Sequence, residues 1–383
     1  MNIPYGRQEI TQDDIDAVVN VLKSDFLTQG PMVSKFEASV AKFVNAKHAV
    51  AMNSATSALH LGCLALGLGQ GDILWTSPIT FVASANCARL CGANVDFVDI
   101  NPLTFSLCPD KLADKFRSAE IHGKLPKIIV PVHLCGQSCD MSVIGALAAN
   151  FGVKVLEDAS HALGGAFEGR PVGNCTYSDV TVFSFHPVKI ATTAEGGVAV
   201  SQNSKLAERM TILRNHGITR NTSQMTNQPD GPWYYQQLDL GFNYRMTDIQ
   251  AALGISQMTR VTQYVKKRNR IAKKYDAEFA DLPITTQYVK KNTFSAFHLY
   301  VVKVDPDHHL RVFKELRNAG INVNVHYIPV HLQPYYSNFG FSRGDFPIAE
   351  EYYSRAISLP IYPAMTERQQ AQVIAAFRKA VLQ

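Results

Sequence analysis

The stretch Val153-Lys-Val-Leu-Glu-Asp-Ala-Ser-His161 begins with an apolar, strand-forming run, Val153–Leu156, and two carboxylates follow it directly. Similar short apolar runs occur at residues 48–53, 73–76, 94–98, 127–133 and 180–185. Helical patterns lie between several of these runs, for example at residues 55–66 and 81–90. Apolar strands that alternate with helices predict an α/β fold with a largely parallel sheet covered on both faces.

The pattern changes near residue 250, which bears on the number of domains. The chain has 383 residues, and a single hydrophobic core rarely holds that many. The later part predicts, in order, a long helix over Thr247–Phe279, a strand over Phe297–Val304, a helix over His309–Asn318, a strand over Ile321–Tyr327 and a helix over Glu367–Leu382. We therefore expect a large α/β domain at residues 1–250 and a smaller α+β domain at residues 251–383.

Composition excludes several classes of protein. No run of about 18 apolar residues is present, and the first residues are polar, so we expect no membrane span and a cytoplasmic protein. The net charge of +5 is not gathered into a stripe with aromatic platforms, which argues against nucleic-acid binding. The seven cysteines lack histidine partners at zinc spacing and indicate reduced core thiols with no metal site.

A candidate anion site is Asn53-Ser-Ala-Thr-Ser57, between a predicted strand and a predicted helix. Free backbone N–H groups and the helix dipole favour a phosphate at such a position, and the hydroxyl groups add donors. Simple capping of the helix by Asn53 or Ser54 explains the same residues equally well.

Three further residues follow in order along the α/β part. Asp158 ends a predicted parallel strand, which is where α/β proteins place their ligand sites. Ser184 and Lys189 lie at and beyond the end of the next apolar run, before Glu195-Gly-Gly197. Burial lowers the pKa of a lysine and makes it a nucleophile or Schiff-base former. Taken singly, Asp158 also fits a helix cap or salt bridge, and Lys189 a surface lysine.

A phosphate cradle, a carboxylate, a hydroxyl and a lysine in this order describe a site for pyridoxal 5′-phosphate (PLP). The protein part of such a site supplies the lysine that holds PLP and an acidic partner for its pyridinium nitrogen. The ordered set carries the hypothesis, since each part alone has an ordinary structural explanation.

The chain resembles the sugar-nucleotide aminotransferases of fold type I, the DegT/StrS type, along nearly its whole length. The resemblance rests on Asn53-Ser-Ala-Thr-Ser-Ala-Leu59, Glu157-Asp-Ala-Ser-His161, Ser184-Phe-His-Pro-Val-Lys189, Glu195-Gly-Gly197, His216-Gly217 and Gly241-Phe-Asn-Tyr-Arg-Met-Thr-Asp-Ile-Gln-Ala-Ala-Leu-Gly254. It implies a large PLP-binding domain with a mostly parallel sheet, a smaller C-terminal domain, and transaminase activity.

The resemblance also implies a role for each matching residue. Lys189 would hold PLP and move protons, and Asp158 would pair with the pyridine nitrogen. His161 stands where many members carry Gln, near the ring oxygen of the cofactor. Phe81 would stack on the PLP ring, and Thr56, Ser57 and Ser184 would bind its phosphate. Asn243 would reach the phosphate of the other subunit's cofactor, in a homodimer with shared active sites.

Within the family, the motifs are most similar to the transaminases of pseudaminic acid biosynthesis. This implies amino transfer from L-glutamate, which leaves 2-oxoglutarate, to C4 of a UDP-4-keto-6-deoxy-N-acetylhexosamine. Candidate contacts to the sugar are Tyr5, Trp233, Tyr234, His326, Tyr327 and His331. Another 4-keto or 3-keto nucleotide sugar is the first alternative. A PLP-dependent sugar dehydratase of the same fold would lack Lys189, and a non-catalytic sensor would not need Lys189 together with Asp158.

Overall fold

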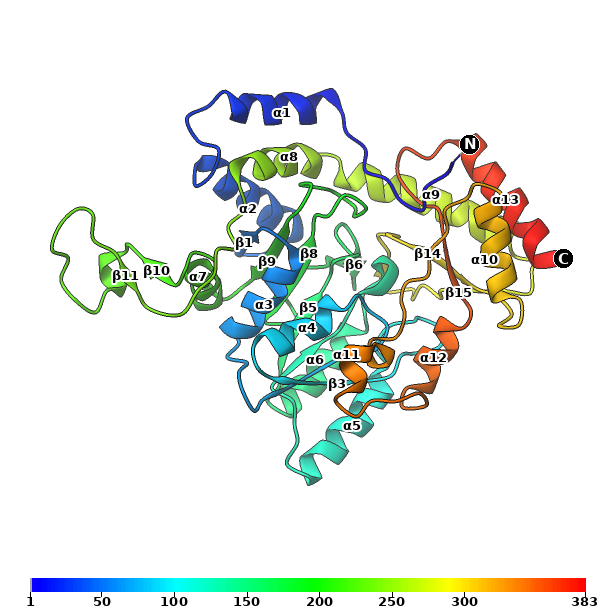
Figure 1. Cartoon of the computed structure of the whole chain (residues 1–383), viewed down its shortest axis with the longest axis horizontal. Coiled ribbons are helices and arrows are strands. Elements are labelled where there is room, and N and C mark those ends of the chain that lie inside the picture. The colour runs from blue at the N-terminus through cyan, green and yellow to red at the C-terminus, as the bar shows by residue number, and fades with distance from the viewer. Residues whose placement is uncertain (1) are drawn as a thin grey trace.

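The computed structural model describes residues 2–383, which form a central sheet flanked by helices and a smaller body beside it (Figure 1). The α-helices are α1 (Gln12–Leu22), α2 (Pro31–Val44), α3 (Ala55–Ala65), α4 (Ala83–Leu90), α5 (Pro109–Ile121), α6 (Met141–Asn150), α7 (Ser204–Leu213), α8 (Asp248–Met258), α9 (Val261–Glu278), α10 (His309–Asn318), α11 (Pro334–Ser337), α12 (Pro347–Tyr353) and α13 (Glu367–Leu382). Short 3₁₀ turns are η1 (Leu134–Gly136), η2 (Thr222–Gln224) and η3 (Val330–Leu332).

The central sheet has seven strands in the order β1-β9-β8-β5-β4-β2-β3. These strands are β1 (His48–Met52), β9 (Gly197–Ser201), β8 (Val180–Ser184), β5 (Lys154–Asp158), β4 (Ile128–Val130), β2 (Ile73–Thr76) and β3 (Asn94–Phe97). Only β9 pairs antiparallel, with β1 on one side and β8 on the other, while β8, β5, β4, β2 and β3 pair parallel. The predicted α/β fold with a mostly parallel sheet is confirmed.

Helices cover both faces of this sheet, which explains why its strands are apolar throughout. On one face, α3, α4 and α7 pack over the strands in a core that includes Leu59, Leu61 and Val182. On the other face, α2 and α8 cover one part around Phe36 and Phe183, and α5 and α6 cover the rest. All five residues of β8 are buried, because neither face of this strand is exposed to water. Its sequence therefore lacks the alternation of polar and apolar residues that a half-exposed strand shows.

Two predicted elements differ from the structure. The helix predicted over residues 247–279 is divided at Thr259 and Arg260 into α8 and α9. Arg260 turns its guanidinium to the buried Asp14, with Nη2 2.5 Å from Oδ1, which anchors the break. The strand predicted over residues 321–327 does not form, because its backbone meets two different partners: Ile321 bridges to Ile3, and Asn324 bridges to Ser358. A ladder that changes partner after so few residues cannot continue as one strand.

The smaller body holds a second core between helices and a three-stranded sheet. Its sheet has the order β12-β14-β15, formed by β12 (Thr285–Thr286), β14 (Tyr300–Lys303) and β15 (Ala356–Leu359), and α9, α10 and α13 pack against it. Ile3 belongs to this core, and α9 begins in the large core at Val261 and ends in the small one at Tyr275. We propose that the division predicted near residue 250 lies inside α9 and that the first residues belong with the smaller body.

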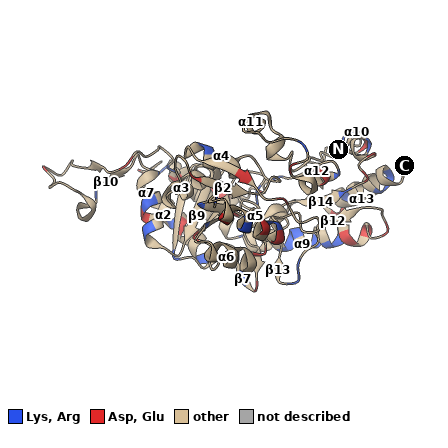
Figure 2. Cartoon of the chain, turned by 90° about the horizontal axis from the view of Figure 1, so that it is seen from below, with Lys and Arg blue, Asp and Glu red and all other residues tan. Residues whose placement is uncertain are grey.

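Residues 219–240 form an arm that projects away from the central sheet, at the left in Figure 1. The arm is a hairpin in which β10 (Ile218–Thr219) pairs with β11 (Gln236–Gln237). The short hairpin of β6 (Ala166–Phe167) and β7 (Arg170–Pro171) instead joins β13 (Thr293–Phe294). Figure 2 shows basic residues on α2, α7 and α9 rather than in one stripe. Among residues 2–383, no helix has both the length and the apolar character that crossing a membrane requires.

Candidate active site

A cavity of about 640 Å³ opens where the parallel strands β5 and β8 end. Parallel sheets bind ligands at this edge because the loops that follow neighbouring strands converge there. The cavity brings together nine of the residues that the sequence singled out: Tyr5, Thr56, Phe81, Asp158, His161, Ser184, Lys189, His326 and Tyr327.

Asp158 is the last residue of β5, and its buried carboxylate faces the cavity. Ser84 Oγ donates to Oδ2 at 2.6 Å, and the Ser160 backbone N–H donates to Oδ1 at 3.0 Å. Two donors leave part of the acceptor capacity of the carboxylate free. Asp158 is therefore held in place by protein groups while it keeps lone pairs for a protonated ligand nitrogen.

Lys189 lies five residues beyond the end of β8, half-buried in the wall of the cavity. Burial lowers the pKa of its amine from 10.5 to about 8, and the negative charge of Asp158 opposes the shift only in part. Among residues 2–383, no carboxylate lies within 4 Å of Lys189 Nζ, so the charged form has no ion-pair partner. A lysine in this state has the neutral amine that nucleophilic and proton-transfer chemistry needs.

The predicted anion site forms at the start of α3. Ser54 caps the helix by accepting the Ser57 N–H at 3.1 Å, and Ser57 Oγ donates to Asn53 Oδ1 at 2.6 Å. Ser57 thus shapes the turn, whereas Thr56 lines the cavity. The N–H groups of the first helical turn point along the helix axis toward this opening and suit a phosphate.

The packing around Gly197, the first residue of β9, explains why a glycine stands there. A Cβ at Gly197 would lie 2.4 Å from the carbonyl oxygen of Ser54 and from the nitrogen of Ala55. Strand β9 therefore packs its backbone directly against the start of α3, which only a residue without a side chain permits. Ser184, paired with Gly197 across the sheet, brings its hydroxyl to the same opening.

Aromatic side chains form the outer wall of the cavity. The Phe81 side chain is 59% exposed, and its ring centroid is 6.1 Å from that of Tyr327 at an interplanar angle of 54°. Tyr5 packs against His326 with centroids 5.2 Å apart. Burial and then the charge of Lys189 lower the pKa of His326 to about 3, so its ring is neutral at physiological pH. An exposed ring over a polar cavity floor is suited to a flat heteroaromatic ligand.

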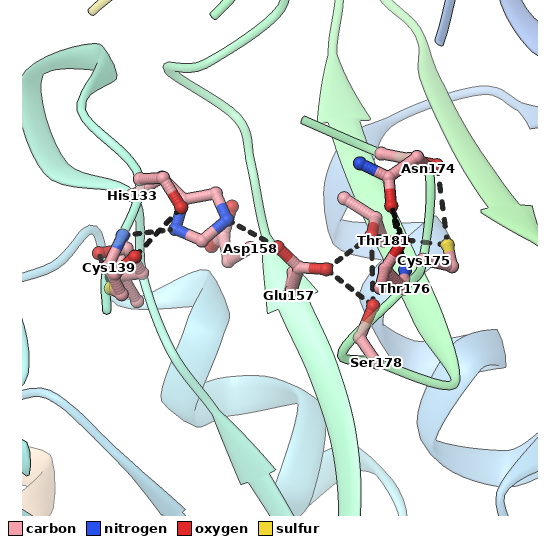
Figure 3. Close-up of polar contacts among 12 residues, drawn as sticks. His133, Cys139, Glu157, Asp158, Asn174, Cys175, Thr176, Ser178 and Thr181 are labelled. Carbon is pink, nitrogen blue, oxygen red and sulfur yellow. Dashed lines mark hydrogen bonds and ion pairs between the residues drawn. The ribbon is translucent and has the colours of Figure 1, made fainter. Parts of the chain in front are cut away.

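A buried network around Glu157 links β5 to β8 and to the loop that follows β4 (Figure 3). Glu157 lies next to Asp158 but on the opposite face of β5, and it accepts from His133 Nε2 at 2.6 Å and Thr181 Oγ1 at 2.9 Å, and also from Ser178 Oγ. Burial raises the pKa of Glu157, but the hydrogen bonds, His133 foremost, outweigh it, so the net pKa lies below 4.5. This charged carboxylate therefore joins β5 to Thr181 of β8 and to His133 in the loop after β4.

Five candidate residues lie outside the cavity. Ser57 acts through the turn described above, and Asn243 is exposed beyond it. Trp233, 71% exposed, and Tyr234 belong to the projecting arm. His331 is fully buried, with Nε2 3.0 Å from Glu350 Oε1, so this structure does not support its predicted contact with the sugar.

Sequence reasoning missed residues that support the others. Ser84 holds Asp158 from the helix α4, and the Ser160 N–H does so from the following turn. Glu195, next to the glycine pair, also lines the cavity. The spacing Phe81 to Ser84, one helical turn, was the available signal for Ser84, because it places both residues on one end of α4.

These groups fit PLP. The first turn of α3 suits its phosphate, Phe81 suits a ring face, Asp158 has free lone pairs for a ring nitrogen, and Lys189 supplies an amine of lowered pKa. In the part of the chain that the structure describes, no group of three or more His, Cys, Asp or Glu is arranged to hold a metal ion, and all seven cysteines are free thiols.

Comparisons with known proteins agree with this site. Residues 8–378 match the model of the DegT/DnrJ/EryC1/StrS aminotransferase family. The Bacillus subtilis spore coat polysaccharide biosynthesis protein SpsC is 39% identical, over 99% of this chain and 97% of its own. The UDP-4-amino-4,6-dideoxy-N-acetyl-beta-L-altrosamine transaminase of Campylobacter jejuni is 36% identical, over 95% and 93%.

Solved structures show the same likeness. Helicobacter pylori PseC, an aminotransferase involved in the biosynthesis of pseudoaminic acid, superposes with a TM-score of 0.91 at 29% identity, over 100% of both chains. The PLP form of the sugar aminotransferase Spr1654 from Streptococcus pneumoniae gives 0.90 at 29% identity, over 100% of this chain and 99% of that one. The chain belongs to the DegT/DnrJ/EryC1/StrS aminotransferase family and is a PLP-dependent sugar aminotransferase.

Proposed function

We propose that this family member transfers an amino group from L-glutamate to C4 of UDP-2-acetamido-2,6-dideoxy-β-L-arabino-hex-4-ulose, as in pseudaminic acid biosynthesis. The observation that carries the chemistry is Lys189, half-buried and of lowered pKa, in one cavity with Asp158. The choice of sugar is supported by the transaminase relative from Campylobacter jejuni and by the likeness to PseC.

PLP supplies an electron-accepting ring that stabilises negative charge at the carbon losing its proton. Lys189 would hold the cofactor, and its neutral amine would be the base that takes and returns that proton. Its lowered pKa keeps a fraction of the amine neutral near pH 7 to 8. Asp158, which Ser84 holds in place, would keep a proton on the ring nitrogen.

The remaining residues bind and orient. Thr56 and Ser184 hold the phosphate together with the first turn of α3, which Ser57 stabilises. Phe81 covers one face of the cofactor ring. Tyr5, His326 and Tyr327 line the outer wall of the cavity, where they would face the sugar.

We propose a homodimer in which the arm and Asn243 complete the partner's active site. Trp233 and Leu240 support this, because they expose 71% and 76% of their surface on a projecting hairpin, and such apolar surface favours a protein contact (Figure 1). Mixing an inactive Lys189→Ala protein with an inactive Asn243→Ala protein tests it, since a mixed dimer regains one intact site. Mixed dimers without activity would exclude shared sites.

A second candidate is amination of a different 4-keto or 3-keto nucleotide sugar. The 39% identity to SpsC, a spore coat polysaccharide biosynthesis protein, favours keeping this candidate. Incubation of the pyridoxamine-loaded protein with a panel of UDP- and dTDP-linked keto sugars, followed by NMR, separates the two. The proposal expects an amine at C4 of the L-arabino UDP sugar; product from another sugar alone would overturn it.

A further inference from the structure

His161 lies between a backbone donor and a tyrosine hydroxyl, buried in the wall of the cavity. The Cys135 N–H donates to His161 Nδ1 at 3.3 Å, and His161 Nε2 lies 3.1 Å from Tyr327 Oη. The His161 side chain is only 4% exposed, so water does not replace either contact. The two ring nitrogens of this histidine therefore have different and fixed partners.

The partner of Nδ1 determines where the ring proton lies. A backbone N–H donates and never accepts, so Nδ1 must offer its lone pair, and the single proton of the neutral ring lies on Nε2. An imidazolium would direct an Nδ1–H at the Cys135 N–H. Burial, followed by the charges of Lys189 and His326, lowers the pKa of His161 well below 6.5, in agreement with this geometry. The other ring packed on it, His298, is 4.4 Å away and also has a lowered pKa.

The donor from Cys135 is held firmly by its surroundings. Cys135 has a left-handed backbone with φ of 64°, and its carbonyl accepts the Leu299 N–H at 3.3 Å. The next residue, Gly136, leaves no room for a side chain, because a Cβ there would lie 2.7 Å from the Phe297 nitrogen. The turn at Cys135 and Gly136 is thus held against the segment around Phe297. The Cys135 N–H therefore keeps its direction toward His161.

The consequence reaches the cavity through Tyr327. Because His161 Nε2–H donates to Tyr327 Oη, the hydroxyl acts as the acceptor there and its own hydrogen is left for another partner. Among residues 2–383, no other side chain bonds to this hydroxyl, and Tyr327 lines the cavity with Lys189 and Asp158. Burial, and then nearby Tyr5 and Asp158, raise the pKa of Tyr327, so it keeps that hydrogen at neutral pH.

We propose that His161 is a positioning residue, neutral in a single tautomer, that aims the hydroxyl hydrogen of Tyr327 at an acceptor oxygen of the bound cofactor or sugar. This inference deepens the proposed function and rests on it, because it needs a ligand in the cavity. His161 neither takes nor gives a proton during the reaction. What the position requires is one acceptor toward Cys135 and one donor toward Tyr327.

The requirement distinguishes two substitutions. A glutamine amide offers a carbonyl acceptor and an N–H donor, so His161→Gln satisfies both partners. Leucine offers neither, so His161→Leu leaves the Cys135 N–H unpaired and the Tyr327 hydroxyl free to rotate. Tyr327→Phe is the matched variant that removes only the hydroxyl.

The first experiment reads the tautomer without turnover. The apoenzyme is labelled with ¹⁵N-histidine, and His161→Gln identifies the His161 signal. We expect a proton on Nε2 only, unchanged between about pH 6 and 8, the range in which an ordinary histidine titrates. A proton on Nδ1, or protonation within that range, would overturn the assignment. This result does not depend on which sugar is the substrate.

The second experiment reads the function of the pair. We expect Tyr327→Phe and His161→Leu each to lower kcat/KM by about 5- to 100-fold, the effect of an unmade buried hydrogen bond. The double variant should be no worse than either, because the two act as one unit. His161→Gln should retain most activity with an unchanged pH profile. Additive losses, or equal damage by Gln and Leu, would contradict the proposal.

The source of the acceptor oxygen follows from the same variants. A weaker affinity of the Tyr327→Phe apoenzyme for PLP identifies the cofactor oxygen, and a raised KM for the sugar with unchanged PLP affinity identifies the sugar oxygen. If neither quantity changes, Tyr327 donates to no ligand and the proposal fails. If wild-type protein aminates no keto sugar, the proposed function fails, while the tautomer measurement still stands by itself.

Discussion

The lowered pKa of Lys189 predicts how fast the apoenzyme captures PLP at each pH. The ordinary lysine pKa is 10.5, and burial brings that of Lys189 to about 8. At pH 7 about 10% of the Lys189 side chains are then neutral, against ~0.03% for an exposed lysine. Since only the neutral amine attacks the aldehyde, the structure predicts a gain of about 300-fold in the reactive fraction at pH 7.

Stopped-flow absorbance of apoenzyme mixed with PLP measures this directly over a pH series. We expect the capture rate to rise with pH and to level off above about pH 8, with Lys189→Ala as the blank for reaction at other lysines. The rate of an ordinary lysine would still be rising tenfold per pH unit at pH 9. A rate that rises in this way through pH 9 would refute the burial argument.

Asp158 provides an internal test of the same reasoning. Its charge opposes the shift of Lys189, so removing that charge should move the pKa further down. Asp158→Asn should therefore move the midpoint of the capture profile below 8, even though it also slows PLP binding at every pH. An upward move of the midpoint would show that the charge of Asp158 does not oppose the downward shift of the Lys189 pKa.

Three other variants test the surroundings of the site. Lys189→Met should stabilise the apoenzyme by at most about 3 kcal/mol below pH 8. Because the pKa of Lys189 is lowered in the folded state, this advantage should shrink between pH 8 and 10.5. A difference in urea unfolding that does not depend on pH would contradict this expectation. Glu157→Gln should cost about 1–3 kcal/mol of unfolding free energy near pH 7. Because the pKa of Glu157 in the folded state lies below 4.5, this cost should fade as the pH drops through that folded value. A constant cost down to pH 3 would contradict a charged Glu157. Gly197→Ala should cost about 1–3 kcal/mol of unfolding free energy and weaken PLP affinity, because the new Cβ would lie 2.4 Å from Ser54. Gly69→Ala is the control, since a Cβ there meets nothing within 4 Å. Equal effects of both substitutions would exclude the close-packing explanation.

The parts of the site that depend on strand order were predictable from the sequence. Asp158 and Ser184 end adjacent parallel strands, and Lys189 follows the second, so the topology alone brings them to one edge. Thr56 reaches the same edge because α3 starts where β1 ends. Local patterns of alternating strands and helices contain this information, since the sheet edge is a property of the backbone.

Other features depend on contacts between distant segments, which a local pattern does not contain. Tyr5 reaches the cavity because the first residues join the smaller body, where Ile3 bridges to Ile321. The direction of β9 was not anticipated either, because an apolar strand reads the same in both directions. Likewise the partners of Glu157 lie 21 and 24 residues away along the chain, so the sequence around Asp158 does not reveal them.

His326 and His331 show most clearly where the sequence stops being informative. They lie close together in the sequence, and the sequence predicts that both contact the sugar. The structure directs His326 Nδ1 to Ser358 Oγ at 2.8 Å in the cavity wall, and His331 Nε2 to Glu350 at 3.0 Å in the core. Glu350 is on α12 and Ser358 on β15, so a partner from a later segment of the chain decides the position of each histidine. Sequence similarity can thus identify candidate site residues, but tertiary hydrogen bonds decide which of them reach the ligand.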